Sequence, residues 1–165
     1  MNEHPADVHP AREGRSTIAV GVEGSVASLA ALRFAVDLAG RTGRSCRAVQ
    51  VWGQPDRVLP VGSGSDVHAD PDASRADAAR LLNDTVRPYR SRLPTLTLEA
   101  ALHQGHIVQA LIHESESAEA LVLGGHKTDP QHHPEVGSAT SGVLHHARCP
   151  VIVVPELRYR PNSLG

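Results

Sequence analysis

A glycine pair and a Gly-Ser pair in the last third of the chain have the spacing that points most directly to chemistry. Gly124 and Gly125 end an apolar run, and a polar segment then leads to Gly137 and Ser138. Glycine lets the backbone approach a ligand closely. A Gly-Ser start to a helix offers free N–H groups and a hydroxyl to an anion. The Walker and Rossmann patterns are absent. Two interpretations of the segment remain open: a phosphate-binding loop, or a strand that ends at glycine and is followed by a helix cap.

The histidines are the second group of residues that can carry chemistry. Eleven are present, and His126, His132 and His133 fall within the polar segment, while His145 and His146 end the helix that follows. Histidine clusters bind zinc or nickel. Adjacent His-His pairs rarely present both rings to one ion, however, and no cysteine or carboxylate stands at ligand spacing. We therefore predict no metal site.

No set of residues for nucleophilic catalysis is recognisable. Cys46 and Cys149 are too few for a disulfide framework. We expect both to be small buried residues, because no base is assigned to either. The Gly-x-Ser-x-Gly pattern is absent. His103, His106 and His113 flank a short helix, and we expect their side chains to be solvated.

Strands and helices are predicted in strict alternation from the hydrophobic periodicity. Ser25 is expected to cap the first helix and Gly40 or Gly43 to end it. Pro88 is expected to kink or fray the second helix. The predicted strands cover 16–22, 45–52, 95–102, 120–124 and 150–154. The first predicted helix runs from Ser28 to Gly40 or Gly43, and the others cover 73–92, a short stretch after Gly105, and 138–146.

This alternation predicts an α/β fold. Parallel strands joined by right-handed crossover helices give a three-layer, doubly wound open sheet. We predict a single domain over 16–156, disordered tails over 1–15 and 157–165, and a surface excursion over 53–72. Such sheets bind ligands at the carboxyl ends of their strands. Residues 23–25 and the segment after Gly124 are therefore expected to meet there.

Composition excludes several function classes. The chain has one Phe, one Trp and two Tyr, so its core must consist of Val, Leu, Ile and Ala, and a stacked aromatic surface for nucleic acid is excluded. The net charge of -2 gives no electrostatic footprint for a phosphate backbone. No apolar run reaches the ~20 residues of a membrane span, and the N-terminus lacks the apolar region of a signal peptide. We expect a soluble cytoplasmic protein without nucleic-acid or membrane partners.

Most of the chain resembles the universal stress protein family. The resemblance covers nearly all of 16–155 and starts with IAVGVEGS over 18–25. It is strongest in ALVLGGHK over 120–127 and in the ending VL-x-x-A-x-CPV-x-VV over 143–154. The fold that it implies is a five-stranded sheet of order 3-2-1-4-5, adenine nucleotide alpha hydrolase-like.

The resemblance implies a site for an adenine nucleotide, ATP with Mg²⁺. The family's nucleotide-binding branch places phosphates on a loop with Gly, two residues, Gly, nine residues and Gly-Ser/Thr. Gly124 and Gly137-Ser138 match this pattern, but Lys127 replaces the middle glycine. Lys127 either adds a cation beside the phosphates or blocks the backbone that glycine allows.

A second departure lies at the end of the first strand, where Glu23 replaces the family's nucleotide-contacting Asp and reaches one methylene further. At the end of the second strand, Val51 is expected to contact adenine through its backbone, with Trp52 as a wall. The site residues that the resemblance implies are Glu23, Val51, Gly124, His126, Lys127, Gly137, Ser138, Ala139 and Thr140.

Three functions are compatible with these residues. The leading one is a non-enzymatic, nucleotide-binding regulatory domain in stress response or signalling, which the resemblance implies to be a homodimer through the last strand. The alternative is a family member that has lost nucleotide binding and acts as a dimeric regulatory or interaction protein, with Lys127 marking the loss. The third is an enzyme with slow ATP hydrolysis or nucleotidyl transfer, for which only Glu23 and His126 stand near the loop as bases.

Overall fold

The computed structural model describes residues 16–53, 71–125 and 138–155. The predicted tails and most of the predicted excursion over 53–72 lie outside these residues. The elements in chain order are β1 (Thr17–Gly21), α1 (Val26–Thr42), β2 (Ser45–Trp52), α2 (Pro71–Arg92), β3 (Leu98–Gln104), α3 (Ile107–Ser117), β4 (Ala120–Gly124), α4 (Ser138–His146) and β5 (Val151–Val154).

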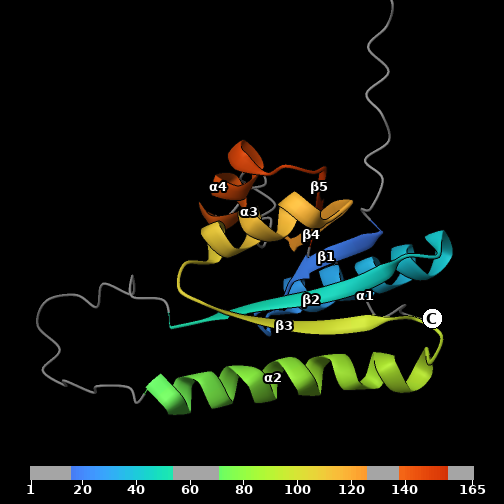
Figure 1. Ribbon diagram of the computed structural model, residues 1–165, viewed down its shortest axis with the longest axis horizontal. Helices are drawn as coiled ribbons and strands as arrows, with labels where there is room; N and C mark the ends of the chain where they lie inside the picture. The colour runs from blue at the N-terminus through green and yellow to red at the C-terminus, as the bar shows by residue number, and fades with distance from the viewer. Residues whose placement is uncertain (1–15, 54–70, 126–137, 156–165) are drawn as a thin grey trace, which may run out of the picture.

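All five strands form one parallel sheet of order β3-β2-β1-β4-β5, which confirms the predicted fold class and strand order. Side chains of β1 alternate between its two faces, as a strand requires. Ile18 and Val20 pack with α1 and α2, whereas Ala19 packs with residues of α3 and α4. Two helices therefore cover each face, and Figure 1 shows α2 and α3 on opposite sides of the sheet.

Small residues bring α1 close to the sheet. Ala31, Ala35 and Ala39 have no exposed surface, and they lie on the helix face that contacts β1 and β4. The helix begins at Val26, two residues before the predicted Ser28, while its cap at Ser25 and its end at Gly43 are as predicted. Ser25 accepts a hydrogen bond from the backbone N–H of Ser28, and Gly43 ends the helix in the left-handed region with φ 67°.

The second helix and the third strand differ in detail from the prediction. The helix α2 begins at Pro71 and continues through Pro88 to Arg92, so the expected fraying does not occur. Arg90 Nε donates to the carbonyl of Leu98 (2.9 Å), which holds the last turn of the helix against β3. The strand starts three residues later than predicted because Leu96 N–H bonds back to the carbonyl of Leu93 in a turn.

No helix in the described part of the chain combines the length and apolar content needed to cross a membrane.

Because the Cys46 thiol is buried, we expect the protein to lose stability in alkaline solution. Burial raises the pKa of this thiol to about 12 from an ordinary value of 9.0. Above pH 9 the unfolded chain releases this proton while the folded chain keeps it. The free energy of unfolding should therefore fall by up to about 1.4 kcal/mol per pH unit between pH ~9 and ~12.

Urea unfolding of the parent and of Cys46→Ala at pH 8, 9.5 and 10.5 measures this effect. The stability difference between the two proteins should shrink as the pH rises. Cys149→Ala is the control for the loss of a thiol outside the core, because Cys149 is partly exposed. Equal slopes for the parent and Cys46→Ala would contradict the prediction.

Candidate functional site

A pocket opens at the carboxyl ends of β1 and β4. Its volume is about 580 Å³, counting the space open to solvent at its mouth. These two strands are neighbours in the sheet although three helices and two strands separate them along the chain, so the pocket lies where the strand order reverses. The described lining residues come from the ends of both strands and from three helices: Gly21, Val22, Glu23, Ala27, Ser28, Ile107, Leu111, Leu123, Gly124, Gly125, Ala139 and Thr140.

A hydrogen-bonded turn holds Glu23 at this pocket. Ser25 Oγ donates to Glu23 Oε1 (2.9 Å) and accepts from the backbone N–H of Ser28 (3.1 Å). The buried Ser28 hydroxyl donates to the carbonyl of Ser25 (2.9 Å). Gly24 allows the turn because its φ is +85°, which other residues rarely adopt. The Ser25 hydroxyl therefore both caps α1 and orients the Glu23 carboxylate.

Gly124 has a structural role that the sequence did not reveal. We expected it to admit a ligand, but the backbone of α1 occupies the space beside it. A Cβ at Gly124 would lie 2.6 Å from the carbonyl carbon of Ala27 and 2.8 Å from the nitrogen of Ser28. Only glycine therefore lets the end of β4 meet the first turn of α1.

The start of α4 also lines the pocket. Ala139 and Thr140, in its first turn, both line the pocket. The first N–H groups of a helix lack intrahelical partners and favour a negative charge. Ser138 begins α4, whereas His126, Lys127 and Gly137 lie outside the described residues.

The structure brings together four of the predicted site residues: Glu23, Gly124, Ala139 and Thr140. Val51 is not among the described lining residues. It lies at the carboxyl end of β2, in register with His103 of β3, and Trp52 is in register with Gln104. Trp52 is likewise not among the described lining residues, and its place as a wall of the site stays a prediction.

Ile107 and Leu111 of α3 were missed as pocket residues. The sequence predicted only a short helix after Gly105, with no role for its side chains in a site. The structure aims one face of this helix at the end of β1, where Leu111 methyl carbons would lie 3.5 and 3.8 Å from a Cβ at Gly21. The pocket therefore has an apolar wall from α3 and a polar wall from α4.

His103 is not solvated as expected. Its Nε2 lies 2.7 Å from Glu114 Oε1, and its side chain is only 30% exposed. His113, 75% exposed, lies 3.6 Å from Glu116, and His145 and His146 are exposed at the end of α4. In the described part of the chain, no three His, Cys, Asp or Glu side chains are grouped so that they could hold a metal ion.

Comparison with known proteins identifies the family. The model of the universal stress protein family matches residues 14–155. The chain belongs to this family. A universal stress protein of Mycobacterium tuberculosis is 29% identical over 139 residues, which are 84% of this chain and 45% of that protein. The chain thus spans about half the length of the curated relatives that it matches.

Solved structures show the same fold. UspA from Lactobacillus plantarum is 28% identical, with a TM-score of 0.65 over 85% of this chain and 98% of that one. A universal stress protein from Archaeoglobus fulgidus in complex with dAMP is 21% identical, with a TM-score of 0.58 over 85% of this chain and 98% of that one. At this identity the second structure supports the fold alone.

Substitution of Gly124 tests the close packing of β4 against α1. Gly124→Ala should destabilise the protein by about 3 kcal/mol or more, because the new methyl group meets backbone atoms that cannot rotate away. Thermal unfolding measures the loss. Gly40→Ala is the matched control, since nothing lies within 4 Å of its Cβ position. It should stabilise α1 by about 0.5–1 kcal/mol. Equal melting temperatures for the two variants would refute the packing argument.

Proposed function

We propose that this chain binds an adenine nucleotide, with ATP and Mg²⁺ as the first candidate, and acts as a non-enzymatic regulatory domain in a stress response. The observation that carries this proposal is the pocket at the point where the strand order reverses, with the start of α4 as one wall. The dAMP of the Archaeoglobus fulgidus protein is an adenine nucleotide on the same fold.

The two walls suit the two halves of a nucleotide. Ile107, Leu111 and Leu123 offer apolar surface to a base, while the first turn of α4 offers N–H groups to phosphate oxygens. Glu23 is the one carboxylate among the described lining residues. Magnesium keeps several waters and needs few protein carboxylates besides the substrate phosphates. Glu23 therefore fits a hydrated Mg²⁺ held mainly by the nucleotide.

One observation favours the alternative function, a dimeric regulatory protein that binds no nucleotide. Among the described residues that line the pocket there is no Lys or Arg, and Glu23 contributes a negative charge. A polyphosphate near Glu23 is repelled unless a cation intervenes. Affinity for nucleotide is therefore the measurement that separates the two functions.

Direct analysis of the purified full chain tests nucleotide binding. The protein is heat-denatured, and any released nucleotide is identified by chromatography and mass spectrometry. ATP and AMP are then titrated by calorimetry with and without Mg²⁺. Released nucleotide, or saturable heat in the micromolar range, supports the proposal. If no nucleotide is released and millimolar ATP and AMP give no binding heat, the alternative function stands.

Ala139→Asp should weaken nucleotide binding without weakening the fold. A carboxylate in the first turn of α4 stabilises the helix by about 0.3–1 kcal/mol but repels phosphate oxygens at the same N–H groups. The dissociation constant for AMP should rise at least about tenfold, equivalent to ~1.4 kcal/mol. Ala139→Asn is the control of nearly equal size and should have a much smaller effect. Equal affinities for the two variants would place the phosphate elsewhere.

A homodimer through β5 is part of the same proposal. This strand lies at the edge of the sheet and pairs with β4 on one side only within the described residues. Val153 is 36% exposed on it, and Leu144 of the neighbouring helix α4 is 44% exposed. An exposed apolar edge strand is a template for pairing with another chain.

Val153→Lys should convert the dimer to a monomer, because a charge on an edge strand opposes pairing. Analytical ultracentrifugation of the full chain at tens of micromolar, an ordinary range for homodimer affinities, measures this change. Phe34→Lys is the control, because Phe34 is similarly exposed (41%) but lies on α1. This variant should remain dimeric. A monomeric parent protein would contradict the edge-strand proposal.

A further inference from the structure

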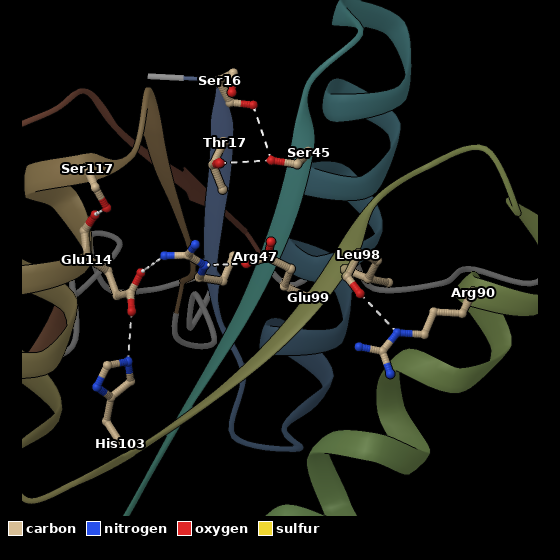
Figure 2. A network of polar contacts seen from close by, with 10 residues as sticks. All are labelled: Ser16, Thr17, Ser45, Arg47, Arg90, Leu98, Glu99, His103, Glu114 and Ser117. Atoms are coloured by element: carbon tan, nitrogen blue, oxygen red, sulfur yellow. Dashed lines mark hydrogen bonds and ion pairs between the residues drawn. The ribbon is translucent and has the colours of Figure 1, made fainter. Parts of the chain in front are cut away.

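A charged cluster joins α3 to the sheet next to the pocket. Arg47 of β2 lies between two carboxylates, with its Nε 2.9 Å from Glu99 Oε2 and its Nη1 3.2 Å from Glu114 Oε2. The other oxygen of Glu114 contacts His103 Nε2 at 2.7 Å. Figure 2 shows Glu114 reaching from α3 to partners on two neighbouring strands.

Glu114 is the buried member of this cluster. Its side chain is 7% exposed, against about 30% for Arg47 and His103. A buried carboxylate is costly unless it is paired and hydrogen-bonded. Because each oxygen has its own partner on a different strand, the carboxylate has one favourable position. That position fixes where this turn of α3 stands over the sheet.

The same helix face supplies the apolar wall of the pocket. Ile107, Leu111 and Glu114 are spaced by four and three residues, so they lie on one face of α3. At 1.5 Å of rise per residue, Glu114 stands about 4.5 Å along the axis from Leu111 and about 10.5 Å from Ile107. A shift of Glu114 along the sheet therefore moves both pocket residues with it.

Among the described residues, other contacts hold α3 to α4 and to the segment that follows it. The helix packs closely on α4, where a Cβ at Gly142 would lie 3.1 Å from Val108. Ser115 Oγ accepts from the backbone N–H of Arg148 (2.8 Å), which ties α3 to the segment before β5. These contacts join α3 to α4 and its following segment, while the charged cluster joins this pair to β2 and β3.

We propose that Glu114 is a positioning residue for the pocket. Through Arg47 and His103 it holds α3 where Ile107 and Leu111 form the wall against which the ligand packs. This inference rests on the proposed binding of an adenine nucleotide. Glu114 touches no ligand in this scheme and acts only through the placement of α3.

Calorimetric titration of AMP into the full chain and into Glu114→Gln tests the proposal. The dissociation constant should rise about tenfold, within the usual range of coupling between sites. Glu119→Gln is the matched control, because Glu119 pairs with Arg44 and lines no part of the described pocket. Both variants lose an ion pair, but only Glu114→Gln should lose affinity. His103→Gln keeps the contact between Arg47 and Glu114 and replaces Glu114→Gln if that variant does not fold.

Methyl NMR of Ile107 and Leu111 in the nucleotide-free protein separates this inference from the proposed function. Their resonances should shift in Glu114→Gln and in His103→Gln and stay in place in Glu119→Gln. If the parent binds neither AMP nor ATP, the proposed function is wrong, and the methyl shifts alone decide whether Glu114 positions the wall. Unchanged resonances in both cluster variants, or unchanged AMP affinity of a folded Glu114→Gln, would overturn the proposal.

Discussion

The contact between the end of β4 and the first turn of α1 is the constraint on which the site depends. A side chain at Gly124 would overlap the backbone of Ala27. The strand and the helix can meet only because this residue is glycine. Their meeting brings Glu23, Ser28 and Gly125 to one pocket. Gly124 therefore determines the shape of the site even in the absence of a ligand.

The protein has few aromatic residues, and its helices pack close to the sheet and to one another. Alanines on α1 and the approach of Val108 to Gly142 let helices lie near the sheet and near one another. Branched aliphatic residues fill the core between them, as expected for strands buried on both faces. Open space then remains at the strand ends, where the helices begin and small residues line the pocket.

Two carboxylates of this protein, Glu23 and Glu114, differ in their exposure to solvent. Glu23 stands at the pocket and is held by the serine that caps α1. Glu114 is buried under α3 and paired with residues of two strands. The first carboxylate can meet a ligand, whereas the second can influence one only through the helix that carries it. The described lining residues include no Lys or Arg, and the start of α4 is the feature among them that favours a negative charge.

The sequence by itself determined the alternation of strands and helices, because buried parallel strands and amphipathic helices have different hydrophobic periods. It also determined the cap at Ser25 and the meeting of Glu23 with Gly124, since the carboxyl ends of parallel strands share one edge. Only the tertiary structure decided the partners of Glu114, because Arg47 stands 67 residues away and their contact depends on the register of β2 and β3. It likewise decided that α3 turns Ile107 and Leu111 to the pocket, since periodicity identifies a buried face but not the neighbour that buries it.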